Sequence, residues 1–197
     1  MEEGAVARVT ENKVLLVCGR GEEKLRQLLS GMGLSPGNAV PSAGEARRML
    51  ARGGYGMVII NAPLADESGL ELAMELTGGS LCAVVLLVKA ELMGMIYDPA
   101  TEAGVLVAAK PLNPQIFQQT VQLAEATRNR LLLISRENEK LHQKLEEMRL
   151  VDRAKCLLIE HEHLTEGEAH RAIEKQAMDA RLSRAKIAKA ILERYEL

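Results

Sequence analysis

The chain has 197 residues, a formal net charge of −2, 47% hydrophobic residues and 26% charged residues. This composition is typical of a globular protein, and the length suits one domain of ordinary size followed by a smaller one. The acidic start lacks the apolar segment of a signal peptide, and no run of about 18 apolar residues can span a membrane, which predicts a cytoplasmic protein without membrane contact.

The first 120 residues alternate short aliphatic runs with amphipathic stretches. This order is typical of βαβ units, which build a parallel sheet covered by helices on both faces. The expected strands are Val14–Val17, a short strand near Ala39 and Val40, Met57–Ile60, Ala83–Val88 and Val105–Ala108. The expected helices are residues 22–31, 43–52 and 68–76, with a weakly patterned fourth near 91–97 that can be partly loop.

The second expected helix begins with a capping box. In the segment Ser42-Ala43-Gly44-Glu45, the hydroxyl of Ser42 and the carboxylate of Glu45 can each accept a hydrogen bond from a free backbone amide. The pattern therefore predicts a helix start at Ala43.

After Lys110-Pro111-Leu112 the pattern changes to one long helix. Asn113 followed by Pro114 is typical of a helix cap with proline at the first helical position, and no helix breaker follows until Thr165. A helix of this length needs a packing partner along most of its length.

Apolar or small residues recur along this helix at alternating steps of three and four. They are Ala124, Thr127, Leu131, Ile134, Asn138, Leu141, Leu145 and Met148. A lone asparagine at the first core position is tolerated in parallel two-stranded coiled coils, where it pairs with its symmetry mate. We therefore predict homodimerisation through a coiled-coil helix, residues 123–150, with a core of Leu131, Ile134, Asn138, Leu141, Leu145 and Met148.

A second interpretation of this helix remains open, because it can instead fold back on its own domain. The flanking charges do not decide: in a dimer Glu137 would meet His142 favourably, whereas Lys144 would face Arg149. Beyond Met148 the apolar pattern slips, which suits a junction into a different packing unit.

Two shorter helices follow the long one. The segment Thr165-Glu166-Gly167-Glu168 is a second capping box and predicts a helix to about Ala180, and Ser183 can cap a last helix that ends near Arg194. Together with the end of the long helix they predict a small three-helix bundle. Residues 171–194 hold seven Lys or Arg against three acids, which makes this end the candidate contact surface.

The amino-terminal part of the chain, residues 12–122, resembles a response-regulator receiver domain. The resemblance rests on the order of the elements, on "GLELA" after the third expected strand, and on Lys110-Pro111 after the fifth. It implies a flavodoxin-like α/β fold with a five-stranded parallel sheet. Receivers take a phosphoryl group on an aspartate at the end of the third strand and hold a magnesium ion with acids after the first.

Most residues needed for that chemistry are replaced in this sequence. Asn61 stands at the phosphoacceptor position, Cys18 and Gly19 replace the acid pair, and Lys110 remains. The positions of the switch hydroxyl and the switch aromatic residue hold Val88 and Val107. An amide is a poor nucleophile and brings no charge to a hard cation, so the resemblance implies a pseudo-receiver without magnesium or phosphoryl transfer.

The carboxyl-terminal part, residues 151–197, closely resembles the ANTAR domain, a three-helix RNA-binding module of bacterial transcription antiterminators. The matching residues are Ala154, Lys155, Leu158, Leu164, Thr165, Glu168, Ala169, Ala177, Met178, Asp179, Arg181, Ile187, Ala188 and Ile191, whereas Cys156 replaces a usual glycine. Proteins of this class join a receiver-like domain, a coiled coil and this bundle, and bind nascent mRNA at hairpins that compete with a terminator. The resemblance implies a dimeric antitermination regulator that acts on hairpins in mRNA leaders.

Without the resemblance, the residues of the bundle indicate a helical core and a set of cations, and they do not specify RNA as the ligand. Helical spacing predicts a core of Ala154, Leu158, Ala169, Ile173, Ala177, Ile187, Ala188 and Ile191, and Met178 is expected to pack rather than to contact a ligand. The cations available for RNA phosphates are Lys155, Arg171, Lys175, Arg181, Arg184, Lys186 and Lys189. Because Tyr195 is the one aromatic residue of this part, structured RNA fits better than a stacked single strand.

Two other functions remain open. The segment Ser183–Leu192 superficially resembles a recognition helix, which favours a DNA-binding transcription factor, and a scaffold acting through protein contacts is the other alternative. An enzyme is least favoured, because the sequence offers no nucleophile–base pair or phosphate loop, and its cysteines and histidines lack metal-ligand spacing. We expect no catalytic residue, metal or cofactor, and regulation by a protein partner, a ligand or abundance.

Overall fold

The computed structural model describes residues 13–195, so the acidic segment 1–12 and residues 196–197 lie outside the described part. Contacts divide the chain into two compact units, one ending at Leu132 and the next beginning at Leu133. The predicted division into three segments stays a prediction. Within the described part, no helix has the length and apolar character needed to cross a membrane.

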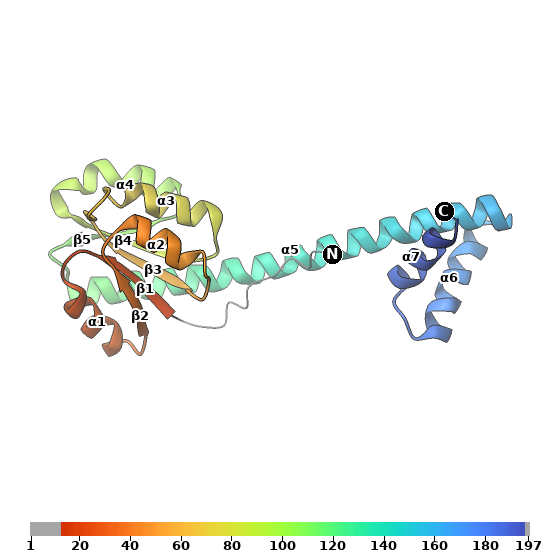
Figure 1. Cartoon of the computed structure of the whole chain (residues 1–197), viewed down its shortest axis with the longest axis horizontal. Helices are drawn as coiled ribbons and strands as arrows, with labels where there is room; N and C mark the ends of the chain where they lie inside the picture. Colours follow the sequence, from red (N-terminus) through yellow and green to blue (C-terminus); the bar gives the residue numbers. More distant parts are fainter. Residues whose placement is uncertain (1–12, 196–197) are drawn as a thin grey trace. The chain divides into compact units, whose positions relative to one another are not determined.

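In its described residues, unit 1 is a five-stranded parallel sheet with helices on both faces (Figure 1). The strands are β1 (Lys13–Cys18), β2 (Ser35–Val40), β3 (Met57–Asn61), β4 (Ala83–Lys89) and β5 (Leu106–Lys110), in the order β2-β1-β3-β4-β5. The helices are α1 (Glu22–Gly31), α2 (Ala43–Leu50), α3 (Leu70–Gly79), the 3-10 turn η1 (Ala90–Leu92), α4 (Met93–Glu102) and the start of α5 (Pro114–Glu162). The expected α/β class is confirmed.

Unit 1 has a hydrophobic core on each face of the sheet, because successive side chains of a strand point to opposite sides. One core holds Leu15 and Leu86 under α2, α3 and α4. The other holds Leu16, Leu29 and Phe117 between the sheet and the helices α1 and α5. This alternation of side chains along each strand determines which side chains lie at the carboxyl ends of β1 and β3.

The strand β2 is longer than the two residues expected, although it contains Pro36 and Gly37. Among the described strands it lies at the edge of the sheet and pairs with β1, and proline is tolerated at an edge. A Cβ atom added at Gly37 would lie 3.1 Å from the carbonyl oxygen of Val14, so glycine permits the close pairing.

Three helices of unit 1 differ from the prediction at their ends, and one of them is α2, which ends at Leu50 rather than at residue 52. The helix α3 begins at Leu70 rather than Ser68, because Gly69 has a left-handed backbone with φ 89°. The helix α4 continues through Pro99 to Glu102, beyond the predicted end near residue 97. Weak apolar periodicity leaves such ends poorly defined in sequence.

The start of α2 is capped by a residue that the sequence pattern did not indicate. Ser42 Oγ accepts from the Glu45 amide at 3.3 Å, as expected. The carboxylate of Asp66 then accepts from the amides of Ala43 and Gly44, each at 2.9 Å. The prediction that Glu45 supplies the capping carboxylate is wrong, because a loop distant in sequence supplies it.

Unit 2, in its described residues, is a bundle formed by the last turns of α5 with α6 (Glu166–Ala180) and α7 (Arg184–Tyr195) (Figure 1). All eight core residues predicted from helical spacing lie in its hydrophobic core. The second capping box is confirmed: Glu168 Oε2 accepts from the Thr165 amide at 2.9 Å, and Thr165 Oγ1 accepts from the Glu168 amide at 3.4 Å.

Candidate functional site

Asn61 ends β3 at the carboxyl edge of the sheet, opposite Cys18 of β1. Its side-chain amide is bonded at both ends: Nδ2 donates to the carbonyl oxygen of Arg20 at 2.8 Å, and Oδ1 accepts from Lys110 Nζ at 2.8 Å. Lys110 Nζ also donates to the carbonyl oxygen of Ala62. The fold therefore brings the lysine to the predicted phosphoacceptor position, which a neutral amide occupies.

The charge of Lys110 is not balanced by the groups that it contacts, which are an amide and a carbonyl oxygen. Burial, followed by the nearby charge of Lys89, lowers the pKa of Lys110. A carboxylate at position 61 would act in the opposite direction, because an opposite charge favours the ammonium form.

The side chains near this edge do not suit a magnesium ion. Cys18 is buried, and this burial, followed by the charge of Glu22, raises the pKa of its thiol. Gly19 has no side chain, and Val88 and Val107 present hydrocarbon. Magnesium prefers carboxylate oxygens, and the described residues contain no group of three His, Cys, Asp or Glu side chains that could hold a metal ion.

The seven predicted RNA-binding cations all lie in unit 2, but they differ in availability. Lys155 Nζ lies 2.9 Å from Asp152 and 3.0 Å from Glu166, and these hydrogen bonds, that to Asp152 first, raise the pKa of Lys155. Arg184 contacts two other carboxylates at 3.6 and 3.7 Å. The remaining five are exposed and form no ion pair with described residues: Arg171, Lys175, Arg181, Lys186 and Lys189.

These five residues are called the α6–α7 cations below. Arg171 and Lys175 lie four residues apart on α6, and Lys186 and Lys189 lie three apart on α7, so each pair shares one side of its helix. Arg181 caps the end of α6 with a left-handed backbone, φ 54°. A conformation that favours glycine therefore holds a long cationic side chain.

The prediction that Met178 packs in the bundle is wrong, since its side chain is 78% exposed. In that turn of α6 the core residue is Ala177, and Ala177 follows the core residue Ile173 by four positions. Met178 instead follows Lys175 by three residues and lies on the cationic side of α6. Leu182, in the turn after α6, is exposed as well.

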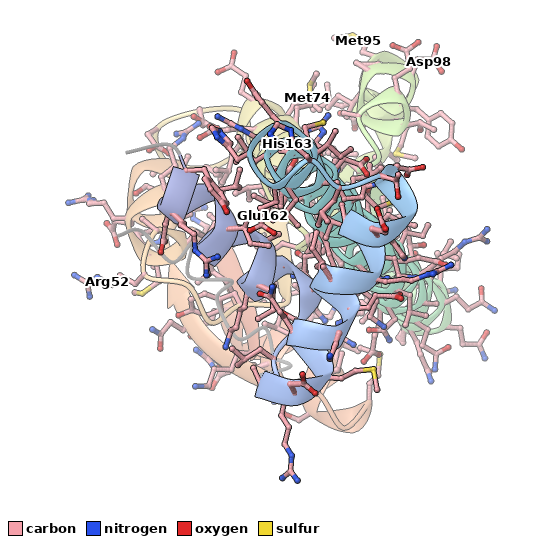
Figure 2. All side chains as sticks on the ribbon, turned by 90° about the vertical axis from the view of Figure 1, so that its right-hand side faces the viewer. Arg52, Met74, Met95, Asp98, Glu162 and His163 are labelled. Atoms are coloured by element: carbon pink, nitrogen blue, oxygen red, sulfur yellow. The ribbon has the colours of Figure 1, made fainter. Side chains whose placement is uncertain are left out.

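The ring of Tyr195 packs within the bundle of unit 2. It stacks on His161 with ring centroids 4.7 Å apart, and the guanidinium of Arg194 lies 5.9 Å from its centroid. Its hydroxyl donates to Glu162 Oε1 at 2.6 Å, at the end of α5 (Figure 2), and this hydrogen bond raises the pKa of Tyr195. The ring therefore joins α7 to α5.

The heptad positions from Leu131 to Met148 form an exposed stripe on α5, called the α5 stripe below. Its five apolar members are between 47% and 61% exposed, and Asn138 is exposed too. Ala124, predicted as the first core position, is instead buried beside Phe117 in unit 1, so that part of the prediction is wrong. The first turns of α5 cover the sheet and leave the later seam residues uncovered in the described chain.

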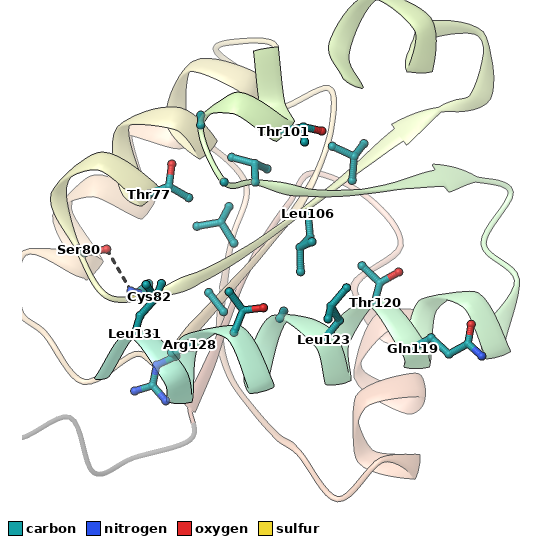
Figure 3. Close-up of a pocket in the computed structure, with 18 of the residues that line it drawn as sticks. Thr77, Ser80, Cys82, Thr101, Leu106, Gln119, Thr120, Leu123, Arg128 and Leu131 are labelled. Atoms are coloured by element: carbon teal, nitrogen blue, oxygen red, sulfur yellow. Dashed lines mark hydrogen bonds between the residues drawn. The ribbon is translucent and has the colours of Figure 1, made fainter. Parts of the chain in front are cut away.

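Unit 1 contains two features that gave no signal in the sequence. A groove of about 520 Å³ lies between α3, α4, β5 and α5, with Thr77, Thr101, Leu106 and Leu123 among its lining residues (Figure 3). Arg128 lies at one end of this groove. It is buried, and its Nε has no hydrogen-bond partner among the described residues.

Comparison with known proteins gives one family match and one group of relatives. Residues 139–192 match the ANTAR domain, and the match begins inside the segment predicted as coiled coil. The transcriptional regulatory protein PdtaR, from two strains of Mycobacterium tuberculosis, is 26% identical to this chain over 138 residues. The alignment covers 70% of this chain and 67% of PdtaR.

Solved structures match unit 1 in fold. A signal receiver domain of an HD domain-containing protein from Pseudomonas fluorescens has 23% identity and a TM-score of 0.54, covering 64% of this chain and 95% of its own. A two-component response regulator from Clostridium difficile has 22% identity and a TM-score of 0.51, covering 58% and 95%. The chain thus joins a unit with the fold of a receiver domain to a carboxyl-terminal ANTAR domain.

Proposed function

We propose that this chain is a cytoplasmic RNA-binding antitermination regulator that acts as a dimer on hairpins in nascent mRNA leaders. The observation that carries the proposal is the set of α6–α7 cations, which lies within the ANTAR match and forms no ion pair with described carboxylates. Exposed cations without partners attract a polyanion, because binding releases the counterions condensed on its phosphates.

The aromatic residues support a structured RNA over a stacked single strand. The chain has one Phe, three Tyr and no Trp, and the ring of Tyr195 stacks on His161 with the Arg194 guanidinium nearby. Readers of single strands commonly stack successive bases on free rings. In a hairpin, the cations can follow the backbone while a few side chains reach the loop bases.

The α5 stripe supports the dimer. Pairing two copies in parallel would bury its apolar residues and set Asn138 against its symmetry mate. Two linked bundles raise the effective concentration of the second for a neighbouring hairpin. A regulatory protein that covers the stripe would keep the chain monomeric and weaken binding to paired hairpins.

The Asn61–Lys110 pair supports an input other than phosphorylation, since the amide is a poor nucleophile and the part of the chain that the structure describes has no group of three His, Cys, Asp or Glu side chains to hold magnesium. Acetyl phosphate with magnesium should therefore leave the mass and the oligomeric state of the protein unchanged. Mass spectrometry and light scattering measure both quantities. A phosphate-dependent shift in either would contradict this part of the proposal.

The binding experiment compares RNA with DNA. Full-length protein is titrated into a fluorescent transcript carrying two hairpins and into duplex DNA of the same sequence, at several salt concentrations. We expect tighter binding to RNA and an affinity that falls as salt rises. Tighter binding to the duplex would support a DNA-binding transcription factor instead.

The functional experiment measures transcript read-through at a terminator. The double variant Arg181→Glu and Lys186→Glu should lower read-through, because acidic groups repel RNA phosphates. Arg52→Glu, which reverses the charge of one exposed arginine of unit 1 (Figure 2), is the control for charge reversal outside unit 2. Unchanged read-through in the double variant would favour a scaffold that works through protein contacts.

A further inference from the structure

Two exposed apolar residues lie at the end of α6 and in the turn after it, in a segment rich in cations. Met178 is 78% exposed and Leu182 is 45% exposed, and both follow Lys175 toward the turn that leads to α7. Single exposed apolar residues are ordinary on protein surfaces. Met178 and Leu182 differ from such residues because cations flank them in sequence. Arg181 lies between the two, and Lys175 precedes Met178 by about one helical turn.

The charge of this segment selects the kind of partner. Residues 171–194 contain seven Lys or Arg and three acids. One of these acids, Glu174, already contacts His170 and Arg184. Asp179, next to Met178, is exposed, but the cations of the segment outnumber its acids, so the segment complements a polyanion.

An unpaired nucleobase needs an apolar or planar surface to replace its stacking neighbours. Tyr195 does not offer a free ring, because His161 stacks on it and the Arg194 guanidinium lies near its centroid. Met178 is a large, adaptable apolar side chain, and its thioether adjusts to irregular shapes. Methionine is also among the side chains that proteins insert against base steps.

We propose that Met178 is the apolar platform on which one unpaired base of an RNA loop packs, in the segment from Lys175 to Leu182. This inference rests on the proposed function. A loop offers an unpaired base to Met178, whereas the bases of a paired stem are stacked on their neighbours. The cations follow the phosphates, and Met178 supplies a contact that depends on the base and not on charge.

Three variants of the full chain test the platform. Met178→Gln keeps the length of the side chain and removes its apolar end, whereas Met178→Leu keeps an apolar side chain. Met95→Gln is the matched control, because Met95 is 75% exposed on α4 of unit 1 (Figure 2). The probe is a hairpin transcript selected by the wild-type protein from a pool with randomised loops.

Met178→Gln should weaken binding about tenfold, the effect of losing one buried methionine contact, while Met178→Leu and Met95→Gln stay within about twofold of wild type. The slope of log affinity against log salt should not change for Met178→Gln. Lys175→Gln should instead reduce that slope by about 0.7 to 0.9, because one phosphate contact disappears. Equal affinities for Met178→Gln and Met95→Gln would overturn the platform.

A thermodynamic cycle locates the base. Each loop nucleotide is replaced in turn by an abasic one, and every RNA is measured with wild type and with Met178→Gln. At one position the abasic change should weaken binding to wild type about tenfold and leave the variant unaffected. Additive losses at all positions would contradict the role of Met178 but not the binding of RNA. If the wild-type protein does not bind hairpins, the proposed function itself is wrong.

Discussion

Lys110 Nζ lies 2.8 Å from Asn61 Oδ1, so the lysine at the end of β5 donates a hydrogen bond to a neutral amide at the end of β3. The lysine donates in addition to the carbonyl oxygen of Ala62. Lys110→Met would leave two partly buried acceptors without a donor. We expect the free energy of unfolding of unit 1 to fall by about 1 kcal/mol, measured by urea denaturation.

The control for this prediction is Arg52→Met, which changes an exposed arginine that follows α2. Surface changes of this kind usually stay within about 0.5 kcal/mol. Equal unfolding free energies for Lys110→Met and Arg52→Met would show that the pair at Asn61 does not stabilise the sheet edge.

A second prediction concerns the α5 stripe. Leu141→Asp should convert a dimer into a monomer, because a carboxylate at a core position would be buried without a partner. Gln143→Asp adds the same charge at an exposed position outside the stripe and should leave the dimer intact. Sedimentation equilibrium distinguishes the two states, and a monomeric wild type would remove the basis of the dimer.

Much of the fold was predictable because its signals are local. The alternating aliphatic runs gave β1, β3 and β4, whose strands are paired in parallel as expected. Thr165 and Glu168 gave the start of α6, because both partners of that capping box lie within one helical turn.

The features that sequence reasoning missed depend on distant contacts. Asp66 caps α2 across a separation of 23 residues, and no periodic pattern connects the two segments. Ala124 fits a heptad and also fits the sheet, and only the packing of α5 decides between the two. Met178 sits next to the core residue Ala177, and the spacing of core positions alone could have placed it outside.

A third prediction separates stability from binding at Arg181. Its left-handed backbone, φ 54°, disfavours a side chain with a Cβ atom, so Arg181→Gly should raise the free energy of unfolding by about 1 kcal/mol. If the guanidinium binds RNA, the same variant should lose affinity. His163→Gly, at φ 55°, should gain similar stability and keep RNA affinity.

Thermal unfolding and RNA titration of both glycine variants check this prediction. Equal affinity in Arg181→Gly and His163→Gly would exclude Arg181 from the contact surface. A loss of stability in Arg181→Gly would show that its side chain contributes more to the fold than the backbone conformation costs.

A fourth prediction follows from the cap of α2. Hydrogen bonds from the amides of Gly44 and Ala43 lower the pKa of Asp66 below its ordinary value of 3.8. The unfolded chain therefore binds the proton more readily than the folded one, and stability is lost as pH falls through the ordinary value toward the lowered one. The urea midpoint of wild type should decrease in this range more steeply than that of Asp66→Asn.

Urea midpoints measured from about pH 6 to pH 3 provide the comparison. Asp98→Asn, at an exposed position on α4 (Figure 2), should follow the wild-type profile. Parallel profiles for wild type and Asp66→Asn would show that the carboxylate does not couple to folding.

The fifth prediction concerns Arg128, whose buried Nε lacks a hydrogen-bond partner among the described residues. Arg128→Met keeps an apolar stem of similar reach and removes a buried charge, so the free energy of unfolding should rise by about 1 kcal/mol. Urea denaturation measures the change. A loss of stability would mean that the guanidinium makes contacts that stabilise unit 1.

Gly56 provides a second test of the Arg128 environment. A Cβ atom added at Gly56 would lie 2.8 Å from Arg128 Cζ. Gly56→Ala should therefore destabilise wild type by about 1 to 2 kcal/mol, since a buried guanidinium has little room to move. In the Arg128→Met background the clash disappears, and the same change should cost less than about 0.5 kcal/mol. The difference between the two costs is the coupling energy of the pair, and additive effects would show that Gly56 is required for another reason.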